Sequence, residues 1–410
     1  MAQDSDVLIV GGGIGGLAAA LACARAGREV RLLERADRFA EVGAGLQLGP
    51  NGARALERLG VLEALDDLAV FPSQIVMRSI WSGDEVSRID LGPRLVQRFG
   101  YRYRVMHRSD LLDALLAAVQ GHSAVTLETG RQVVDAEFGE SSSEVRCADG
   151  SRFRGRILVA ADGLNSVLRP LIAGPDQTRC EGYSAYRGTV PFAELPEHAG
   201  EDTVVLYAGD GVHLVQYPVR GGRLYNQVAC FRSKRFDGAS AGDDWATPEE
   251  LDAAFADAAP YVRASIARID RRMRWPLKDR APIDRWVRGT AVLMGDAAHP
   301  MYQYVAQGAC QALEDAVALG DCLGGGSGSE ALHRFATLRQ KRTARVQETA
   351  RRFGDIIHFG GTASALRDHF LASRDPADYA PMEWLWGPPD GHPARPGHAA
   401  PVPGTLEMMK

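Results

Sequence analysis

One segment near the start of the chain limits its fold more than any other feature. Residues 7–10 are four consecutive hydrophobic residues, which is typical of a parallel strand buried on both faces. In the next six residues every position except Ile14 is glycine, and the alanine-rich stretch 17–26 then predicts a helix. A second strand is expected over 29–33, directly before Glu34. This order predicts a βαβ unit that binds a dinucleotide.

The spacing Gly11-x-Gly13-x-x-Gly16 gives each glycine a task. Gly11 permits the tight turn, Gly13 lets backbone N–H groups reach a pyrophosphate, and Gly16 lets helix and strand touch. The helix N-terminus adds partial positive charge for the phosphates. The motif alone does not distinguish FAD from NAD. The residues expected to contact the nucleotide are Gly11, Gly13, Ile14, Gly15, Gly16, Glu34, whose carboxylate would accept from ribose hydroxyls, and Arg35.

Composition excludes several other classes of protein. The chain has 410 residues and a formal charge of −5 at pH 7, which argues against a protein that mainly binds nucleic acid or an anionic membrane. The six cysteines form no C-x-x-C pair, and no histidine lies at zinc-ligand spacing from them, so no metal site is expected. An acidic start and the lack of a long hydrophobic run predict neither export signal nor membrane span, which favours a cytoplasmic protein of about two domains.

Two β-like regions interrupt this nucleotide-binding pattern. Residues 75–80 and 85–89 alternate around a turn, and three longer alternating strands are expected between 204 and 231, which predicts an antiparallel sheet. Ser109 is a candidate N-cap for a helix over 110–119. Further helices are expected at 307–323 and 330–357, and the chain past 375 looks irregular.

Two later segments each carry an acid at the end of a buried strand. Residues 159–169 run from a strand into an Asp-Gly turn at Asp162, and residues 291–294 lead into a Gly-Asp pair that ends at Asp296. Such an acid can hold a ribityl or ribose hydroxyl. Together with the glycine motif, in this order, the two segments resemble the class A flavoprotein aromatic hydroxylases over residues 6–355.

The resemblance implies an α/β fold in which a Rossmann-like FAD-binding domain carries an inserted antiparallel β-sheet substrate domain, like that of p-hydroxybenzoate hydroxylase, and C-terminal helices. It also implies tightly bound FAD, NADH or NADPH as a transient co-substrate, O2, a small aromatic acid and a homodimer. The predicted division places the FAD-binding domain at 1–70, 101–178 and 286–370, the last with the C-terminal helices, the substrate domain at 71–100 and 179–285, and an irregular tail at 371–410.

The same resemblance implies roles for residues at matching positions. Glu34 looks like the ligand of the adenosine ribose, Arg108 like a ligand on the pyrophosphate side, and Asp296 like the ribityl contact. Asp162 resembles a residue that serves both FAD and nicotinamide binding, although it can also be a turn residue that caps the backbone. A surface ion pair is the alternative for Arg108. The remaining expected flavin contacts are Val42, Gly43, Ala44 and Gln47 along the isoalloxazine, and Gly308 and Ala309 in the following helix.

Family chemistry also indicates where a base is needed. The C4a-hydroperoxide of the reduced flavin is attacked well by an aromatic ring only when a ring hydroxyl is losing its proton, and a phenol has a pKa near 10. Histidine is the side chain whose free pKa suits that step. His213 is the candidate, because period two in 212–218 places His213, Val215 and Tyr217 on one strand face. His299 competes, but its place after the Gly-Asp motif has a structural explanation.

Substrate choice depends on a departure from the common family pattern. Gln303 stands where many members place a proline against the flavin, and Tyr304 follows it. With the His213 strand and the motif at 383–387, this resembles the branch that converts 3-hydroxybenzoate to 2,5-dihydroxybenzoate (gentisate) more than the branch that decarboxylates salicylate. In this interpretation His213 deprotonates the substrate, while Gln303 and Tyr217 orient the ring. An amide that caps loose backbone is the alternative for Gln303.

Other functions stay open at this stage. Salicylate 1-hydroxylation or hydroxylation of another hydroxy- or aminohydroxybenzoate is the alternative within the family, and no arginine is evident as a ligand for a substrate carboxylate. An NAD-dependent dehydrogenase would be colourless, whereas a flavoprotein is yellow. A flavoprotein that does not hydroxylate would show no acceleration of NADH oxidation by aromatic acids.

Overall fold

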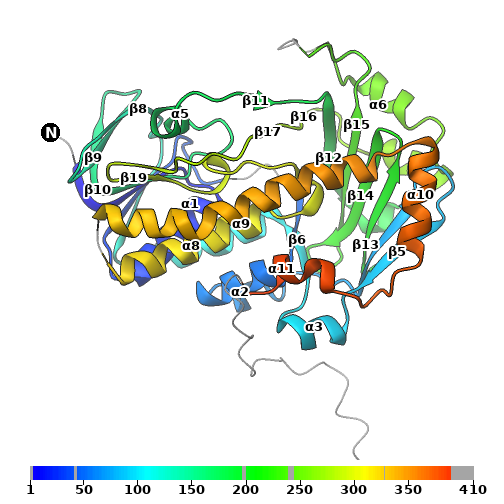
Figure 1. Ribbon diagram of the computed structural model, residues 1–410, viewed down its shortest axis with the longest axis horizontal. Coiled ribbons are helices and arrows are strands. Elements are labelled where there is room, and N and C mark those ends of the chain that lie inside the picture. The colour runs from blue at the N-terminus through cyan, green and yellow to red at the C-terminus, as the bar shows by residue number, and fades with distance from the viewer. Residues whose placement is uncertain (1–2, 41–43, 196–199, 239–243, 327, 389–410) are drawn as a thin grey trace, which may run out of the picture.

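The computed structural model describes residues 3–40, 44–195, 200–238, 244–326 and 328–388, and it shows an α/β protein built on two large sheets. The sheets lie at opposite ends of the molecule's long axis, and one long helix, α9 (Gly328–Ile357), runs between them (Figure 1). Among the described residues no helix is both long enough and apolar enough to cross a membrane.

The first sheet contains the N-terminal strand. Its main path runs through β18 (Val287–Arg288), β19 (Ala291–Leu293), β10 (Arg152–Ala160), β1 (Gln3–Val10), β2 (Val30–Leu33) and β7 (Val125–Glu128). The pairs from β19 to β7 are all parallel, whereas β18 is antiparallel. A hairpin of β8 (Val133–Phe138) and β9 (Ser143–Cys147) extends β10. Residues 7–9 of β1 are fully buried, as their hydrophobic run predicts.

Helices rich in small residues pack on this sheet. The alanines of α1 (Ile14–Arg25) bring α8 (Gly308–Gly324) so close that a Cβ on Gly320 would lie 3.0 Å from the Ala22 carbonyl oxygen. The other helices in this part of the molecule are α2 (Pro50–Arg58), α4 (Arg108–Gln120), α5 (Leu168–Ala173) and the 3-10 turns η1 (Glu63–Leu65) and η3 (Gly295–Ala297). Segments from both ends of the chain therefore build one core.

The second sheet has seven strands among the described residues. Their order is β16 (Arg274–Pro276), β12 (Tyr183–Pro191), β15 (Leu224–Arg232), β14 (Val212–Val219), β13 (Thr203–Gly209), β4 (Gln74–Ser79) and β5 (Glu85–Asp90). One face packs on α6 (Pro248–Ala254) and α7 (Pro260–Ile266). The sheet is antiparallel except that β13 and β4 run parallel, because a strand from early in the chain joins it at that edge.

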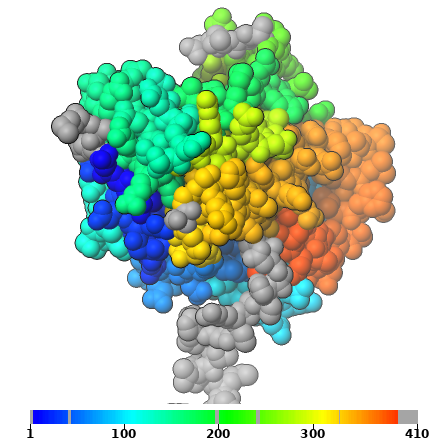
Figure 2. All heavy atoms as spheres, turned by 60° about the vertical axis from the view of Figure 1, so that its left-hand side comes forward, coloured from blue at the N-terminus to red at the C-terminus, as the bar shows by residue number. Residues whose placement is uncertain are grey.

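Shorter elements connect these two parts. Two-stranded sheets join β3 (Gly45–Leu48) to β6 (Arg104–His107) and β11 (Thr178–Arg179) to β17 (Asp279–Arg280). The remaining elements are α3 (Pro93–Phe99), η2 (Phe192–Glu194), η4 (Gln303–Val305), α10 (Gly361–Ala372), η5 (Ala380–Met382) and α11 (Glu383–Trp386). Figure 2 shows α8 and α9, in yellow to orange, on the surface between the blue N-terminal segment and the orange-red C-terminal helices.

Two local predictions were wrong. Helix α4 begins at Arg108 with His107 as its N-cap, because the His107 ring rather than Ser109 accepts a hydrogen bond from the first turn, at Ser109 N. The chain past 375 is not wholly irregular, since residues 380–386 form η5 and α11. Arg98 pairs with Glu383, and the Trp386 ring packs against Phe99, so tertiary contacts order a segment with little propensity of its own.

Candidate active site

The glycine loop has the geometry that its sequence predicts. Gly11 has φ +109°, and a Cβ there would overlap the Ala161 carbonyl oxygen. A Cβ on Gly16 would overlap the Gly11 carbonyl oxygen, so helix α1 could not pack on β1 with any other residue there. Glu34 accepts hydrogen bonds from Gly12 N at 2.7 Å and from Ala36 N at 2.9 Å. Its carboxylate therefore lies at the mouth of the loop, while Arg35 is exposed.

Open space lies beside the start of α1. A Cβ built on Gly13 would meet no atom within 4 Å, although Gly13 is flanked by tightly packed positions. Gly13 is also the N-cap and provides no side-chain cap, so the first N–H groups of the helix remain available to an anion. Ile14 is buried behind them. This cradle fits the pyrophosphate of a dinucleotide.

The Gly-Asp motif that ends at Asp296 lies beside the start of α1, although it comes from the later part of the chain. A Cβ built on Gly15 would lie 3.4 Å from the Ala312 side chain of α8 and 4.0 Å from the Met294 side chain. Asp296 is exposed although its neighbours are buried, and it makes no hydrogen bond or ion pair with any residue that the structure describes. Its oxygen lies 4.0 Å from a Cβ built on Gly308, the first residue of α8, and Ala309 follows. An acid and a helix N-terminus thus stand together, ready for a polar ligand.

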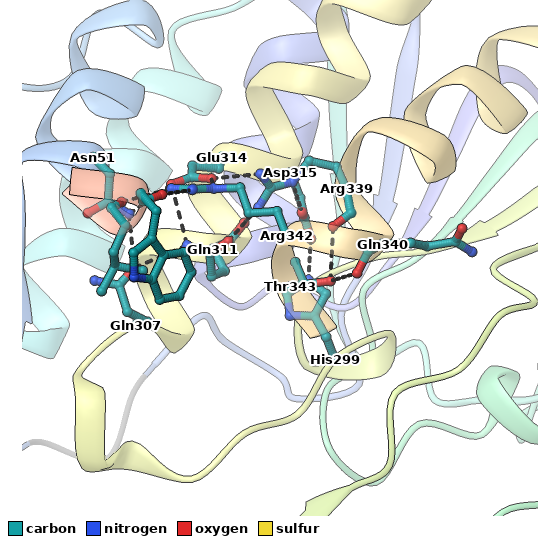
Figure 3. A network of polar contacts seen from close by, with 12 residues as sticks. Asn51, His299, Gln307, Gln311, Glu314, Asp315, Arg339, Gln340, Arg342 and Thr343 are labelled. Carbon is teal, nitrogen blue, oxygen red and sulfur yellow. Dashed lines mark hydrogen bonds and ion pairs between the residues drawn. The ribbon is translucent and has the colours of Figure 1, made fainter. Parts of the chain in front are cut away.

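A buried network holds this turn in place (Figure 3). Asp315 accepts from Gly295 N at 2.9 Å and from His299 Nε2 at 2.6 Å, while Arg339 of α9 donates to its other oxygen at 2.7 Å. Burial disfavours the charge on Asp315, but His299 and Arg339 outweigh it and lower the pKa to about 2. His299 therefore supports the Gly-Asp turn, in agreement with the structural explanation that its position suggested.

Asp162 serves the backbone of its own turn. Its carboxylate accepts from Ser166 Oγ at 2.6 Å, Val167 N at 2.8 Å and Leu168 N at 3.2 Å, immediately before α5. Burial raises the pKa of Asp162 above its usual value. These contacts are those of the turn-capping alternative, and the turn itself adjoins Gly11 through Ala161.

The segment expected along the flavin connects the two sheets. Val42 and Gly43 lie outside the described residues, but Ala44 is buried and its carbonyl accepts from Arg108 N at 2.9 Å. Arg108 thus stands at the start of α4, directly beside that segment. Gln47, on β3, accepts from Tyr103 Oη at 2.8 Å. Hence Ala44, Gln47 and Arg108 are brought together by the pairing of β3 with β6.

One face of the second sheet turns toward this segment. As predicted, β14 presents His213, Val215 and Tyr217 on that face, and their partners on β15 are Cys230, Val228 and Asn226. Asn226 accepts from Gly45 N at 2.6 Å, and a Cβ on Gly45 would crowd both Asn226 and Tyr217. Glycine is therefore needed where β3 crosses the sheet.

His213 lies at the other end of the face, and sequence reasoning missed its partner. It is 2% exposed, and its Nδ1 lies 2.8 Å from Nε2 of His358, just past the end of α9. Burial, then His358, lowers the pKa of His213 well below its usual value. The ring of Tyr304 packs edge-on against His213, with centroids 5.5 Å apart. His213 is therefore neutral at pH 7, so it can accept a proton but is not poised near pKa 7 by itself.

Gln303 differs from its neighbour Tyr304 in its surroundings. It is exposed at the start of η4, and its side chain makes no hydrogen bond to a residue that the structure describes, so the structure does not support the capping alternative. Tyr304 rather than Gln303 contacts His213. The role of Gln303 toward a substrate remains a prediction.

Arg187 is a second residue that sequence reasoning missed. It pairs with Val228, which pairs with Val215, so its side chain shares the face that carries His213 and Tyr217. Its guanidinium stacks on Trp275 at 3.7 Å from the ring centroid. Burial raises the pKa of Tyr217, and the positive charge of Arg187 opposes that rise. The signal was an arginine at an alternating strand position, visible only once the register of β12 is known.

Comparisons with known proteins agree with this arrangement. A family model described as an FAD binding domain matches residues 4–352. A 3-hydroxybenzoate 6-hydroxylase of Klebsiella oxytoca is 38% identical over 390 residues, covering 94% of this chain and 98% of that protein. A 3-amino-4-hydroxybenzoate 2-monooxygenase of Streptomyces cremeus is 35% identical, covering 95% and 97%. The solved structure of Klebsiella pneumoniae HpxO complexed with FAD and uric acid has a TM-score of 0.82 at 28% identity, covering 94% and 97%.

The fold and the site thus define a flavoprotein monooxygenase, in which FAD rather than NAD is the resident cofactor. The chain belongs to the FAD-binding-domain family, and within it the chain is an FAD-dependent aromatic hydroxylase that uses NAD(P)H and O2.

Proposed function

We propose that the protein hydroxylates 3-hydroxybenzoate at the carbon para to its hydroxyl group and so forms 2,5-dihydroxybenzoate. The observation that supports this most is the sheet face on which a neutral imidazole, a guanidinium and a phenol, from His213, Arg187 and Tyr217, stand in successive rows. A hydroxylated aromatic acid offers a matching set of groups: a hydroxyl for the imidazole, a carboxylate for the guanidinium and a ring that the phenol can orient. The similarity to a 3-hydroxybenzoate 6-hydroxylase over nearly the whole chain supports the same substrate.

FAD would be held by the two motifs that meet at α1 and α8. In this proposal the N–H groups after Gly13 bind the pyrophosphate, Glu34 the adenosine ribose, Asp296 the ribityl chain, and Arg108 the pyrophosphate side. Asp162, with its turn beside Gly11, stays a proposed contact of FAD and nicotinamide. The bound flavin, once reduced by NADH or NADPH, supplies the activated oxygen.

His213 acts as the base for the substrate hydroxyl. Because the site lowers its pKa, the imidazole is neutral and accepts the phenolic proton, and the phenolate and imidazolium that result stabilise each other as an ion pair in a buried site. Electron density then rises at the positions ortho and para to the oxygen. Tyr217 and Gln303 are proposed to orient the ring.

Arg187 is proposed to bind the substrate carboxylate. A guanidinium held flat against Trp275 presents its N–H donors in a fixed plane, which suits a carboxylate. Since Arg187 lies in the row between His213 and Tyr217, carboxylate binding there would leave the ring between the base and the phenol.

Product analysis tests this proposal. The purified yellow protein is given NADH or NADPH with 3-hydroxybenzoate, salicylate, 3-amino-4-hydroxybenzoate or benzoate, and products are identified by chromatography and mass spectrometry. We expect 2,5-dihydroxybenzoate from 3-hydroxybenzoate, and no hydroxylation of benzoate, which has no hydroxyl proton for His213. Catechol and carbon dioxide from salicylate, without turnover of 3-hydroxybenzoate, would instead assign salicylate 1-hydroxylation.

A further inference from the structure

We infer that His358 is a positioning residue that accepts a hydrogen bond from Nδ1–H of His213 and thereby keeps Nε2 of His213 as the lone pair that receives the substrate proton. This inference rests on the proposed role of His213 as the base.

The contact between the two rings is short and shielded from water. His213 Nδ1 and His358 Nε2 are 2.8 Å apart, and the two residues are 2% and 8% exposed. Two neutral imidazoles form such a bond only when one nitrogen carries a proton and the other does not. The tautomer of one ring therefore determines the tautomer of the other.

The nitrogen left free on His213 decides the direction of this bond. Because Nδ1 of His213 faces Nε2 of His358, only Nε2 of His213 can receive a proton from the substrate. A neutral ring with its lone pair on Nε2 carries its hydrogen on Nδ1, so His213 donates and Nε2 of His358 accepts. Tyr183 stacks on His358, with ring centroids 4.5 Å apart at 15°, and holds the ring in that plane.

The other groups around the pair keep it neutral. Burial lowers the pKa of His358 to about 4, and Arg367 of α10 contributes to the lowering while the Gly354 carbonyl opposes it. Cys230 of β15, Tyr304 of η4 and Tyr183 of β12 face the pair, and burial raises the pKa of each, so they too are uncharged at pH 7. The proton that charges the pair is then the one from the substrate.

The proton transfer balances simply. The substrate O–H bond breaks, its electron pair stays on the oxygen as phenolate, and the proton forms a bond to Nε2 of His213. The Nδ1–H bond of His213 stays intact, and its hydrogen bond to His358 becomes stronger because the donor is now cationic. His358 thus stabilises the imidazolium without contact with the substrate.

A metal site is the competing interpretation of this cluster. Ligand atoms of His213, Cys230 and His358 lie within 4.8 Å of one another. However, the direct bond between the imidazoles uses the lone pair that an ion would need on His358, and burial raises the pKa of the Cys230 thiol, which disfavours the thiolate. The geometry fits a proton-sharing pair better.

Two variants of His358 test the inference. His358→Gln retains an acceptor, the amide oxygen, whereas His358→Leu removes it, and His333→Gln is a matched control on the exposed side of α9. In the FAD-loaded protein, long-range ¹H–¹⁵N spectra of the histidine rings should show Nδ1–H for His213 in the wild type, His333→Gln and His358→Gln. His358→Leu should lose that single tautomer.

Substrate ionisation and kinetics provide the second readout. Binding of 3-hydroxybenzoate without reductant should give the ultraviolet difference spectrum of a phenolate in the wild type and in His358→Gln. In His358→Leu the same spectrum should appear only at a higher pH than in the wild type. Coupled kcat should fall by about 10- to 100-fold in His358→Leu with KM little changed, and His358→Gln should recover most of it.

Several results would overturn the inference. They are Nε2–H on His213 in the wild type, wild-type behaviour of His358→Leu, or one equivalent of zinc in the purified protein. The wild-type spectrum needs no variant to fold. If it shows Nδ1–H while no hydroxybenzoate is ionised or hydroxylated, the proposed function fails and the tautomer assignment stands. Hydroxylation at equal rates by the wild type and by His358→Leu would instead leave the proposed function intact and remove His358 from it.

Discussion

His213 illustrates how burial alters the chemistry that a residue type suggests. A free histidine titrates near the pH at which a base is useful. His213 is buried against the His358 ring, and its pKa therefore lies well below that pH, so the imidazole is neutral there. Its worth as a base then depends on what stabilises the imidazolium: the substrate anion on one side and His358 on the other.

Removal of that base should separate hydroxylation from cofactor binding. In His213→Ala we expect normal FAD content and nearly normal binding of 3-hydroxybenzoate, with coupled hydroxylation reduced about 10²-fold or more, the usual contribution of a positioned base. Product formed per NADH oxidised is the measurement. Coupled turnover at the wild-type level near pH 7 would remove His213 from the mechanism.

Arg187 should affect only substrates that carry a carboxylate. For Arg187→Gln we expect KM for 3-hydroxybenzoate to rise about 10- to 100-fold, from loss of charged hydrogen bonds worth about 1.5–3 kcal/mol. The neutral analogue 3-hydroxybenzamide serves as the control, since its KM should change little. An equal rise for both compounds would show that Arg187 supports the sheet rather than recognises an anion.

Among the secondary-structure elements, helices α8 and α9 are joined by buried ion pairs. Arg339 donates to Glu314 at 2.6 Å and to Asp315 at 2.7 Å, and Arg342 connects Glu314 to the Trp384 and Leu385 carbonyls of α11 (Figure 3). Removal of one partner from such a pair leaves a buried charge without compensation. The network therefore links the turn at Gly295 to helix α11.

Two aspartates on neighbouring elements should respond differently to substitution. Asp315→Ala is expected to lower the free energy of unfolding by about 3–5 kcal/mol and to reduce FAD content, because Arg339 loses its partner and the Gly295 turn loses its anchor. Asp296→Ala, at an exposed position, should reduce FAD content with a change in apoprotein stability within about 0.5 kcal/mol. Urea unfolding of the apoproteins and the flavin absorbance measure both quantities. Normal flavin content in Asp296→Ala would contradict the proposed ribityl contact.

For the whole molecule, the long helix α9 decides which segments meet. Thirty residues of α helix span about 45 Å, enough to run from the first sheet to the second (Figure 1). Arg339 of this helix binds Asp315, which anchors the turn at Gly295, and His358 just past its end contacts His213 of β14. The proposed division into FAD-binding and substrate domains, and the proposed homodimer, are separate questions, which limited proteolysis and sedimentation can address.

The buried histidine pair also predicts a pH dependence of stability. The pKa of His358 is about 4 in the folded protein and about 6.5 when unfolded, so between these values the unfolded chain binds a proton that the folded chain does not. Stability is then full above pH 6.5 and decreases as the pH falls toward 4, by about 3 kcal/mol for His358 alone. His213 acts in the same direction.

His358→Gln is the test of that prediction. Urea unfolding at pH 7 and pH 5 should show a smaller pH-dependent loss of stability in His358→Gln than in the wild type and in His333→Gln. The carboxylates of Glu314 and Asp315, with pKa values near 2, do not interfere, because their contribution is lost only below about pH 4. Equal losses in all three proteins would mean that the pair titrates normally.

Features with a local cause follow from the order of the amino acids alone. The glycine motif specified a strand, a turn and a helix start, because positive φ at Gly11 and the lack of a Cβ at Gly16 are requirements of neighbouring residues. Alternation along 212–218 likewise placed His213 and Tyr217 on one face, because a strand has period two.

Contacts between residues that are distant in the chain depend on the three-dimensional fold. His358 lies 145 residues from His213, and Arg187 reaches the same face through two strand registers. No short-range pattern encodes such pairs, since they depend on how far α9 extends and on how the strands align. The C-terminal helix α11 was mispredicted for the same reason, because tertiary contacts outweighed local propensity there. The His107 cap was mispredicted although its hydrogen bond is local, from Ser109 N to the ring two residues earlier.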